Sequence, residues 1–330
     1  MLQSGRHDIV LGKLTTRRPL SSSHRPTPDT SRLAVEVPIA APRVPSAGIG
    51  PYPGINMLVG VALVALSVAT PVARPWSDQD QVAQPATATP LSDDQIEAFL
   101  RDAKVVKTKS VGKGVTGTIR ATLTDGTLTH DAQIQQIEEK KTQFEAAGAS
   151  EFNFEDSWRF NVAAYRVDRL IGLQMVPVTV SRKWKSAPAA FTWWIDDVMM
   201  DEGKRLQDKT QPPDSGLWNE QMQMVRLFDQ LIANTDRNSG NLLIGKNWQV
   251  WAIDHTRAFR TQNTLPAPAK IARCDRQVLA GLKALNREVL QREIGDFVSD
   301  FQIAGVLARR DQIVAIIDKA GPAGVFDRRR

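Results

Sequence analysis

Three polar side chains that could form a catalytic centre lie close together in the sequence, between residues 234 and 257. Asp236 is followed five positions later by Asn241, and Asp254 comes thirteen positions after that. Carboxylate and amide oxygens suit hard divalent cations, so Asn241 and Asp254 could hold Mg²⁺ or Mn²⁺. Asp236 would then accept a proton from a substrate hydroxyl, and Arg237 would hold Asp236 or neighbouring backbone carbonyls in place.

The residues between these side chains predict how they are brought together. Two short apolar runs, 242–244 and 248–253, are separated by Gly245-Lys246-Asn247. This pattern predicts a strand, a turn and a second strand, with the polar groups at the two ends lying together. The alternative is a polar turn whose Asp and Asn side chains only cap backbone groups.

The segment resembles the catalytic segment of protein-kinase-like phosphotransferases, in which a base Asp, a metal-binding Asn and a second metal-binding Asp recur in this order and spacing. Its Asp-Arg-x-x-x-Asn form is closer to the atypical branch: phosphoinositide lipid kinases, HipA-like kinases and secretory-pathway Golgi kinases. The resemblance implies an α+β fold with a small β-rich N-lobe and an α-rich C-lobe. His255-Thr256-Arg257 stands where protein kinases have Phe-Gly, so we do not expect their activation-segment switch here.

A glycine-rich stretch lies earlier in the chain. Gly112, Gly114 and Gly117 match G-x-G-x-x-G, and the alternating, β-branched residues 118–123 follow them. Asp125-Gly126 then predicts a hairpin turn before a second strand. Glycine loop, strand, turn and strand is the order in which a kinase-like small lobe covers the phosphates of ATP. The alternative is a glycine-rich hairpin without a special role.

The sequence departs from the family at the ion pair that usually places the nucleotide. The third strand should carry a lysine for the phosphates where Gln135 or Gln136 stands, and Asn161 occupies the place of the partner glutamate. Lys113 in the glycine loop, and Lys140 and Lys141 just after the strand, are candidate replacements. These departures favour a second hypothesis, a pseudokinase or nucleotide-binding regulatory module without turnover.

Hydrophobic periodicity and turn residues predict the remaining elements. Ser92 and Gln95 form a capping-box pattern before a helix. Strand 191–200 contains Trp193 and Trp194, which we expect near the hinge between the lobes, at an adenine pocket or simply in the core. The other elements are helices over 154–171, 218–232, 276–293 and 301–320, a strand over 175–182, and a polar loop over 201–215.

Composition excludes several other classes of protein. The net charge is +6, of which +4 lies in residues 1–56, so the rest of the chain is nearly balanced. This distribution argues against a nucleic-acid-binding surface. A single cysteine, Cys274, excludes an intrachain disulfide. His130 and His255 have no Cys or His at metal-ligand spacing, which disfavours a zinc site.

The N-terminal part of the chain differs from the rest. Residues 1–56 are rich in Ser, Pro, Thr and Arg and are predicted to be disordered. Residues 57–73 form an apolar segment typical of a signal peptide, too short for a membrane span, which needs about 20 residues. We therefore expect an exported or secretory protein, with a cytoplasmic protein carrying a flexible apolar linker as the alternative. Residues 74–90 are a linker before an N-lobe over 91–200 and a C-lobe over 201–325.

The sequence thus predicts an ATP-dependent phosphotransferase that requires Mg²⁺ or Mn²⁺. Its partners would be a nucleotide and a hydroxyl-bearing acceptor, and protein, lipid, sugar and small-molecule acceptors all fit. We expect no nucleic-acid partner and no stable membrane span.

Overall fold

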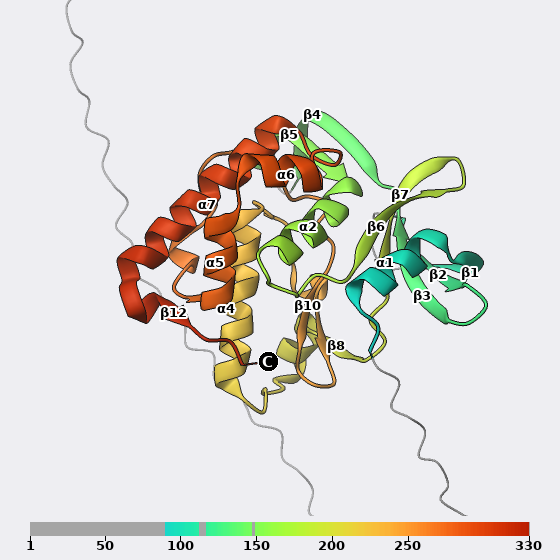
Figure 1. Ribbon diagram of the computed structural model, residues 1–330, viewed down its shortest axis with the longest axis horizontal. Coiled ribbons are helices and arrows are strands. Elements are labelled where there is room, and N and C mark those ends of the chain that lie inside the picture. The colour runs from blue at the N-terminus through green and yellow to red at the C-terminus, as the bar shows by residue number, and fades with distance from the viewer. Residues whose placement is uncertain (1–89, 112–116, 147–148, 330) are drawn as a thin grey trace, which may run out of the picture. The chain divides into compact units, whose positions relative to one another are not determined.

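The computed structural model describes residues 90–111, 117–146 and 149–329, which belong to one unit, Val82–Arg330. Figure 1 shows that the first half of this unit is built largely of strands and the second half largely of helices. The described chain therefore has the two-lobed α+β architecture that the sequence predicts.

An antiparallel five-stranded sheet forms most of the N-lobe. Its strand order is β1-β2-β3-β7-β6. The strands are β1 (Lys104–Ser110), β2 (Ile119–Thr124), β3 (Thr129–Gln135), β6 (Thr179–Trp184) and β7 (Ala187–Trp193). The predicted hairpin is confirmed, because β2 pairs with β3 across the turn that contains Asp125 and Gly126. Strand β1 precedes the glycine-rich stretch and was not predicted.

The two faces of this sheet differ because successive side chains point to opposite sides of a strand. One face is apolar and buried, through Ala121, Leu123, Ala132 and Ile134. Helix α1 (Asp93–Asp102) packs on the sheet, and the predicted capping box of Ser92 and Gln95 at its start is confirmed. The other face of β2 and β3 is polar, with side chains that include Arg120, Thr122, Asp131, Gln133 and Gln135.

A long hairpin and a helix follow the sheet's third strand. The hairpin consists of β4 (Glu138–Ala146) and β5 (Ala149–Ser157), and helix α2 (Arg159–Leu170) comes directly after it. The prediction of one helix over 154–171 was wrong at its start, because Phe154 to Ser157 pair with β4. The helix ends as predicted at Gly172, whose φ of 69° is readily adopted only by glycine.

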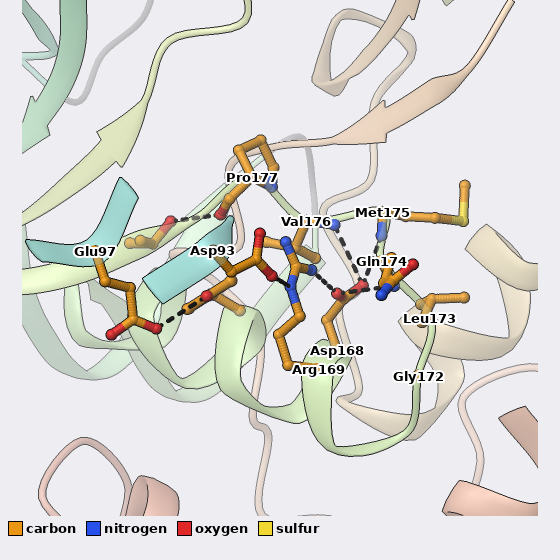
Figure 2. A network of polar contacts seen from close by, with 12 residues as sticks. Asp93, Glu97, Asp168, Arg169, Gly172, Leu173, Gln174, Met175, Val176 and Pro177 are labelled. Carbon is orange, nitrogen blue, oxygen red and sulfur yellow. Dashed lines mark hydrogen bonds and ion pairs between the residues drawn. The ribbon is translucent and has the colours of Figure 1, made fainter. Parts of the chain in front are cut away.

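A buried carboxylate organises the chain between α2 and β6 (Figure 2). Asp168 is fully buried and accepts hydrogen bonds from the backbone N–H groups of Gln174, Met175 and Val176, at 3.0, 2.9 and 3.2 Å. Arg169 forms an ion pair with it. The loop fixed in this way reaches the C-lobe, because the carbonyl of Met175 accepts a hydrogen bond from Ala252 N–H.

A small sheet and a set of helices form the C-lobe. The sheet has the order β10-β9-β8, and a short parallel pair joins β11 and β12. The elements are β8 (Val198–Asp201), α3 (Glu202–Asp208), α4 (Ser215–Leu231), β9 (Leu242–Gly245), β10 (Val250–Ala252), β11 (Cys274–Asp275), α5 (Arg276–Ala284), α6 (Arg287–Ile294), α7 (Asp300–Ala320) and β12 (Val325–Phe326).

Two predictions for this lobe were wrong. The predicted polar loop over 201–215 contains helix α3, which Asp201 caps by accepting a hydrogen bond from Lys204 N–H. The predicted helix over 276–293 is interrupted at Leu285 and Asn286, and Asn286 caps the second piece. A short polar side chain at the start of a helix stabilises it by accepting a backbone N–H. Such caps begin α3 where hydrophobic periodicity predicts no helix, and begin α6 where it predicts one continuous helix.

An arginine lies inside the C-lobe rather than on its surface. Arg309 of α7 is fully buried and donates to the carbonyls of Leu231 and Arg260 at 2.8 and 3.0 Å, and also to that of Gln262. Burial lowers its pKa to about 10. The side chain therefore ties the end of α4 to the segment that follows the Asp254 loop.

None of the described helices is both long and apolar enough to cross a membrane.

Candidate active site

An acid of helix α4 holds the loop that carries Asp236 in place. Asp229 is buried and accepts hydrogen bonds from Arg237 and from the side chain of Asn234. The side-chain oxygen of Asn234 accepts the backbone N–H of Asp236 at 3.2 Å. Burial raises the pKa of Asp229 although Arg237 lies beside it. Helix α4 therefore sets the backbone position of Asp236 through the side chains of Asp229 and Asn234.

Arg237 connects this loop to the hairpin on which the two predicted metal ligands lie. Its Nη1 donates to the carbonyl of Asn241 at 3.1 Å and to that of Ile253 at 2.6 Å. The N–H of Ile253 donates in turn to the carbonyl of Asn241 at 3.0 Å. The residue just before Asp254 is thus held against Asn241, as expected for the two ends of the β9–β10 hairpin.

Asp254 lies at the point where the chain leaves β10. Its φ of 55° is left-handed, a conformation that Asp tolerates better than most residues and that often occurs at functional sites. Its Oδ1 accepts the hydroxyl of Thr256 at 3.1 Å. Asp254 lines a small hollow together with residues of β3 and α2.

A further carboxylate, Asp156 at the end of β5, lies near Asp254. Burial raises the pKa of Asp156, the Thr256 hydroxyl opposes that shift, and the negative charge of Asp254 raises the pKa further. The Oδ1 atom of Asp156 is buried and has no hydrogen-bond partner among the described residues. An unsatisfied carboxylate oxygen beside a second carboxylate is what a divalent cation would satisfy.

The donor set therefore fits Mg²⁺ or Mn²⁺ and does not fit zinc. Asp254, Asp156 and the amide oxygen of Asn241 are oxygen donors, which hard cations prefer. Within the part of the chain that the structure describes, no group of three or more His, Cys, Asp or Glu side chains could hold a metal. Such a site would need water or substrate oxygens to complete its coordination shell.

Asp236, the predicted base, faces solvent and an arginine. Its side chain is 50% exposed, and its Oδ2 lies 3.2 Å from Nη1 of Arg257. An exposed carboxylate beside the loop of Asp254 can be approached by an acceptor molecule. The sequence placed Arg257 at the end of the motif without assigning it a role.

Gln135 and Asn161, at the positions of the expected lysine and glutamate, face each other. The Asn161 side chain donates to Oε1 of Gln135 at 2.6 Å, and its Oδ1 accepts the backbone N–H of His255 at 2.7 Å. Both side chains are buried. A neutral amide pair therefore stands where the family has an ion pair, and it links β3, α2 and the loop after Asp254.

His255 has a structural environment. Its imidazole is buried and packs edge-on against Phe228, with ring centroids 5.9 Å apart. Burial holds its pKa well below the usual value, and the charge of Arg237 lowers it further, so the ring is neutral. Near Asp254, the backbone N–H of His255 donates a hydrogen bond to Asn161.

The predicted nucleotide-binding residues are spread over three places. Gly112, Lys113 and Gly114 lie outside the described residues. Gly117 is described and has a φ of 61°, a left-handed conformation suited to glycine. Lys140 lies on β4, is 65% exposed, and forms an ion pair with Glu155 at 2.7 Å.

Two hollows lie next to these groups. A narrow one separates the polar face of the sheet from the Asp254 loop; its volume of about 10 Å³ leaves room for one water molecule. The second, of about 430 Å³, lies beside the segment between β7 and β8 and is lined by Trp193, Trp194 and Trp251.

Sequence reasoning missed three residues of the site. Asp229 is an acid among the apolar residues of α4, and an acid on the buried side of a helix is a signal that could have been used. Arg257 is a charged residue inside the recognised motif. Asp156 carried no signal, because its approach to Asp254 depends on the β4–β5 hairpin, which was not predicted.

Comparison with known proteins identifies the fold. No family model and no curated protein matches the sequence. A hydra Fam20 structure with sugar superposes with a TM-score of 0.54 at 12% identity, covering 71% of this chain and 92% of that chain. The Golgi casein kinase with Mn/ADP bound has a TM-score of 0.48 at 12% identity, covering 71% and 78%. The first of these similarities carries the conclusion that the chain has an atypical protein-kinase-like fold.

Proposed function

We propose that this protein is a divalent-metal-dependent phosphotransferase of the atypical kinase type, which transfers a phosphoryl group from ATP to a hydroxyl acceptor. The observation that carries the proposal is the arrangement around Arg237, which joins the Asp236 loop to the carbonyls of Asn241 and Ile253. A kinase-like fold with these groups at the start and end of its β9–β10 hairpin supports this chemistry more than any other class.

The residues take distinct roles in this proposal. Asp236 accepts the proton of the acceptor hydroxyl while the acceptor oxygen forms a bond to the terminal phosphorus. The bond from that phosphorus to the bridging oxygen breaks, and ADP leaves with the electron pair. Asp254, Asn241 and Asp156 would hold the cation, which when bound neutralises charge on the phosphate oxygens. Arg237 keeps the two loops in register.

We place the nucleotide base in the larger hollow beside Trp193, Trp194 and Trp251. A volume of about 430 Å³ lies in the range of small-molecule sites, about 300–1,000 Å³. Indole rings offer large flat surfaces for a purine. Trp251 is three residues before Asp254, so a base in this hollow would leave its phosphates within reach of the cation site.

A full-length chain incubated with ATP and Mn²⁺ tests the proposal. We expect ATP with Mn²⁺ to raise the melting temperature of the wild type and to yield ADP and phosphate, with water as the acceptor. Asp254→Asn should lose the Mn²⁺-dependent part of the shift. Asp236→Asn should show a shift at least as large as that of the wild type and lose about 100-fold or more in ADP release, since general base catalysis contributes about 10²–10⁴.

The control for this experiment is Asp318→Asn, which removes an exposed carboxylate paired with Lys283 of α5. It should match the wild type in both readouts. A wild type that binds ATP with Mn²⁺ but releases no ADP would favour the second candidate, a nucleotide-binding pseudokinase, which the neutral Gln135–Asn161 pair supports. Absence of any shift with ATP and either Mg²⁺ or Mn²⁺ would contradict both.

A further inference from the structure

The guanidinium of Arg257 lies beside the carboxylate of Asp236, the candidate base. Its Nη1 is 3.2 Å from Asp236, and the group lies 4.9 Å from the centroid of the Phe154 ring. Arg257 also acts electrostatically on Asp156, whose own pKa responds to Asp254. A cation at this position, with its side chain 24% exposed, can meet a ligand that enters beside Asp254.

The neighbouring cations of the described cleft are held elsewhere by their own carboxylates. Gln135 replaces the family's phosphate-binding lysine and is neutral. Ion pairs hold the cations of the polar sheet face, the β4–β5 hairpin, the start of α2, the larger hollow and the Asp236 loop: Arg120 with Asp131, Lys140 with Glu155, Lys141 with Glu139, Arg159 with Glu138, Lys246 with Asp197 and Arg237 with Asp229. Among these residues and Arg257, only Arg257 forms its ion pair with a candidate catalytic carboxylate.

We propose that Arg257 binds the terminal phosphate oxygens of the phosphoryl donor and so replaces the lysine that this chain lacks on β3. The inference rests on the proposed function, since it assigns the phosphate-binding cation of that same site. A guanidinium is always charged and has five N–H donors in a planar fork, so it can serve a carboxylate and a phosphate together. Charge-assisted bonds of this kind are among the stronger hydrogen bonds in proteins.

This placement has a consequence for Asp236. In the structure the carboxylate of Asp236 engages Arg257, so an incoming phosphate shares the guanidinium with it. Shared contact would hold the terminal phosphoryl group and the base on one side chain and thereby align donor and acceptor. Asp236 and an incoming phosphate would also compete for Arg257, so the charge of Asp236 should weaken phosphate binding. An Arg257 with only a structural role would not produce this effect.

Tripolyphosphate is a suitable probe because it carries the phosphates of ATP without a base or sugar. We expect Arg257→Ala in the full-length chain to bind tripolyphosphate about 10- to 100-fold more weakly than the wild type, and Arg257→Lys to recover part of the loss. Asp236→Asn should bind tripolyphosphate several-fold more tightly, and this gain should disappear in the Arg257→Ala background. Isothermal titration calorimetry gives all five affinities.

Arg276→Ala serves as the matched control, because Arg276 is an exposed arginine paired with Asp327 at 2.7 Å. It should bind tripolyphosphate as the wild type does. If Arg257→Ala fails to fold, Arg257→Gln keeps a polar side chain without the charge and should show the same loss. Equal tripolyphosphate affinity in wild type and Arg257 variants, or no binding by the wild type, overturns the inference. The outcome would be different if the proposed function alone were wrong. In that case tripolyphosphate binding would still depend on Arg257, but ATP would yield no ADP.

Discussion

Gln135 and Asn161 form the contact by which this site departs most from the family that it resembles. An ion pair between a strand lysine and a helix glutamate attracts over a range of distances, whereas two amides interact only at hydrogen-bond distance. Here Asn161 bonds both to Gln135 and to the backbone of His255, and all three groups are buried. The pair therefore fixes α2 against the Asp254 loop without contributing charge.

Replacing Asn161 by leucine tests this role. Asn161→Leu removes the donor to the buried Oε1 of Gln135 and the acceptor of the His255 N–H, so we expect a loss of about 2–5 kcal/mol in the free energy of unfolding. Denaturation by urea measures it. Asn286→Ala is the control, since it removes only a helix cap and should cost about 1 kcal/mol. Equal losses in both variants would contradict the role given to Asn161.

At the scale of elements, the loop between α2 and β6 depends on one carboxylate. Asp168 accepts three backbone N–H groups of this loop, and the loop in turn contacts β10 through Met175 and Ala252. Figure 2 shows the backbone of residues 174–176 converging on its two oxygens. Because backbone donors without partners are costly in the interior, this loop and the start of β6 are held in one conformation.

The pH dependence of stability tests the environment of Asp168. Burial raises its pKa from 3.8 to about 6, so the folded state binds the proton more readily than the unfolded chain between those values. The unfolding free energy contributed by this group therefore falls as pH rises from about 4 to 6. The advantage of wild type over Asp168→Asn should be about 2 kcal/mol larger at pH 4.5 than at pH 7.5.

Urea denaturation of both chains at the two pH values gives that difference directly. Asp131→Asn is the comparison, because hydrogen bonds and the charge of Arg120 lower the pKa of Asp131, which should give the opposite trend. A difference between wild type and Asp168→Asn that grows with rising pH would contradict the assignment.

At the scale of the whole molecule, the candidate site belongs to one unit of the chain. Residues 82–330 form this unit, and its apolar core includes buried residues of both the β-rich and the helical halves. The cleft between the polar sheet face and the Asp254 loop is narrow. Of the two hollows next to the site, the one beside Trp251, of about 430 Å³, is the one with room for a nucleotide base.

A chain that starts at Val82 tests whether this unit is sufficient. We expect it to have the same unfolding free energy as the full chain within about 1 kcal/mol, because a compact unit with its own apolar core can fold alone. Its response to ATP with Mn²⁺ should equal that of the full chain. Calorimetric scans of both proteins measure these quantities, and a melting temperature lowered by more than about 5 °C would show that residues 1–81 contribute to the fold.

The sequence alone determined the local parts of this protein. The β9–β10 hairpin, the capping box before α1, helix α4 and the end of α2 at Gly172 follow from hydrophobic period, turn chemistry and glycine conformation, which act over a few residues. The order of Asp236, Asn241 and Asp254 also led to the kinase-like fold. Only the tertiary structure decided that Asp156 reaches Asp254, that Asn161 bonds to Gln135, and that Arg257 lies on Asp236. These contacts join residues that are distant in sequence or lie on irregular loops, and packing of whole elements, which no local pattern encodes, sets their distances.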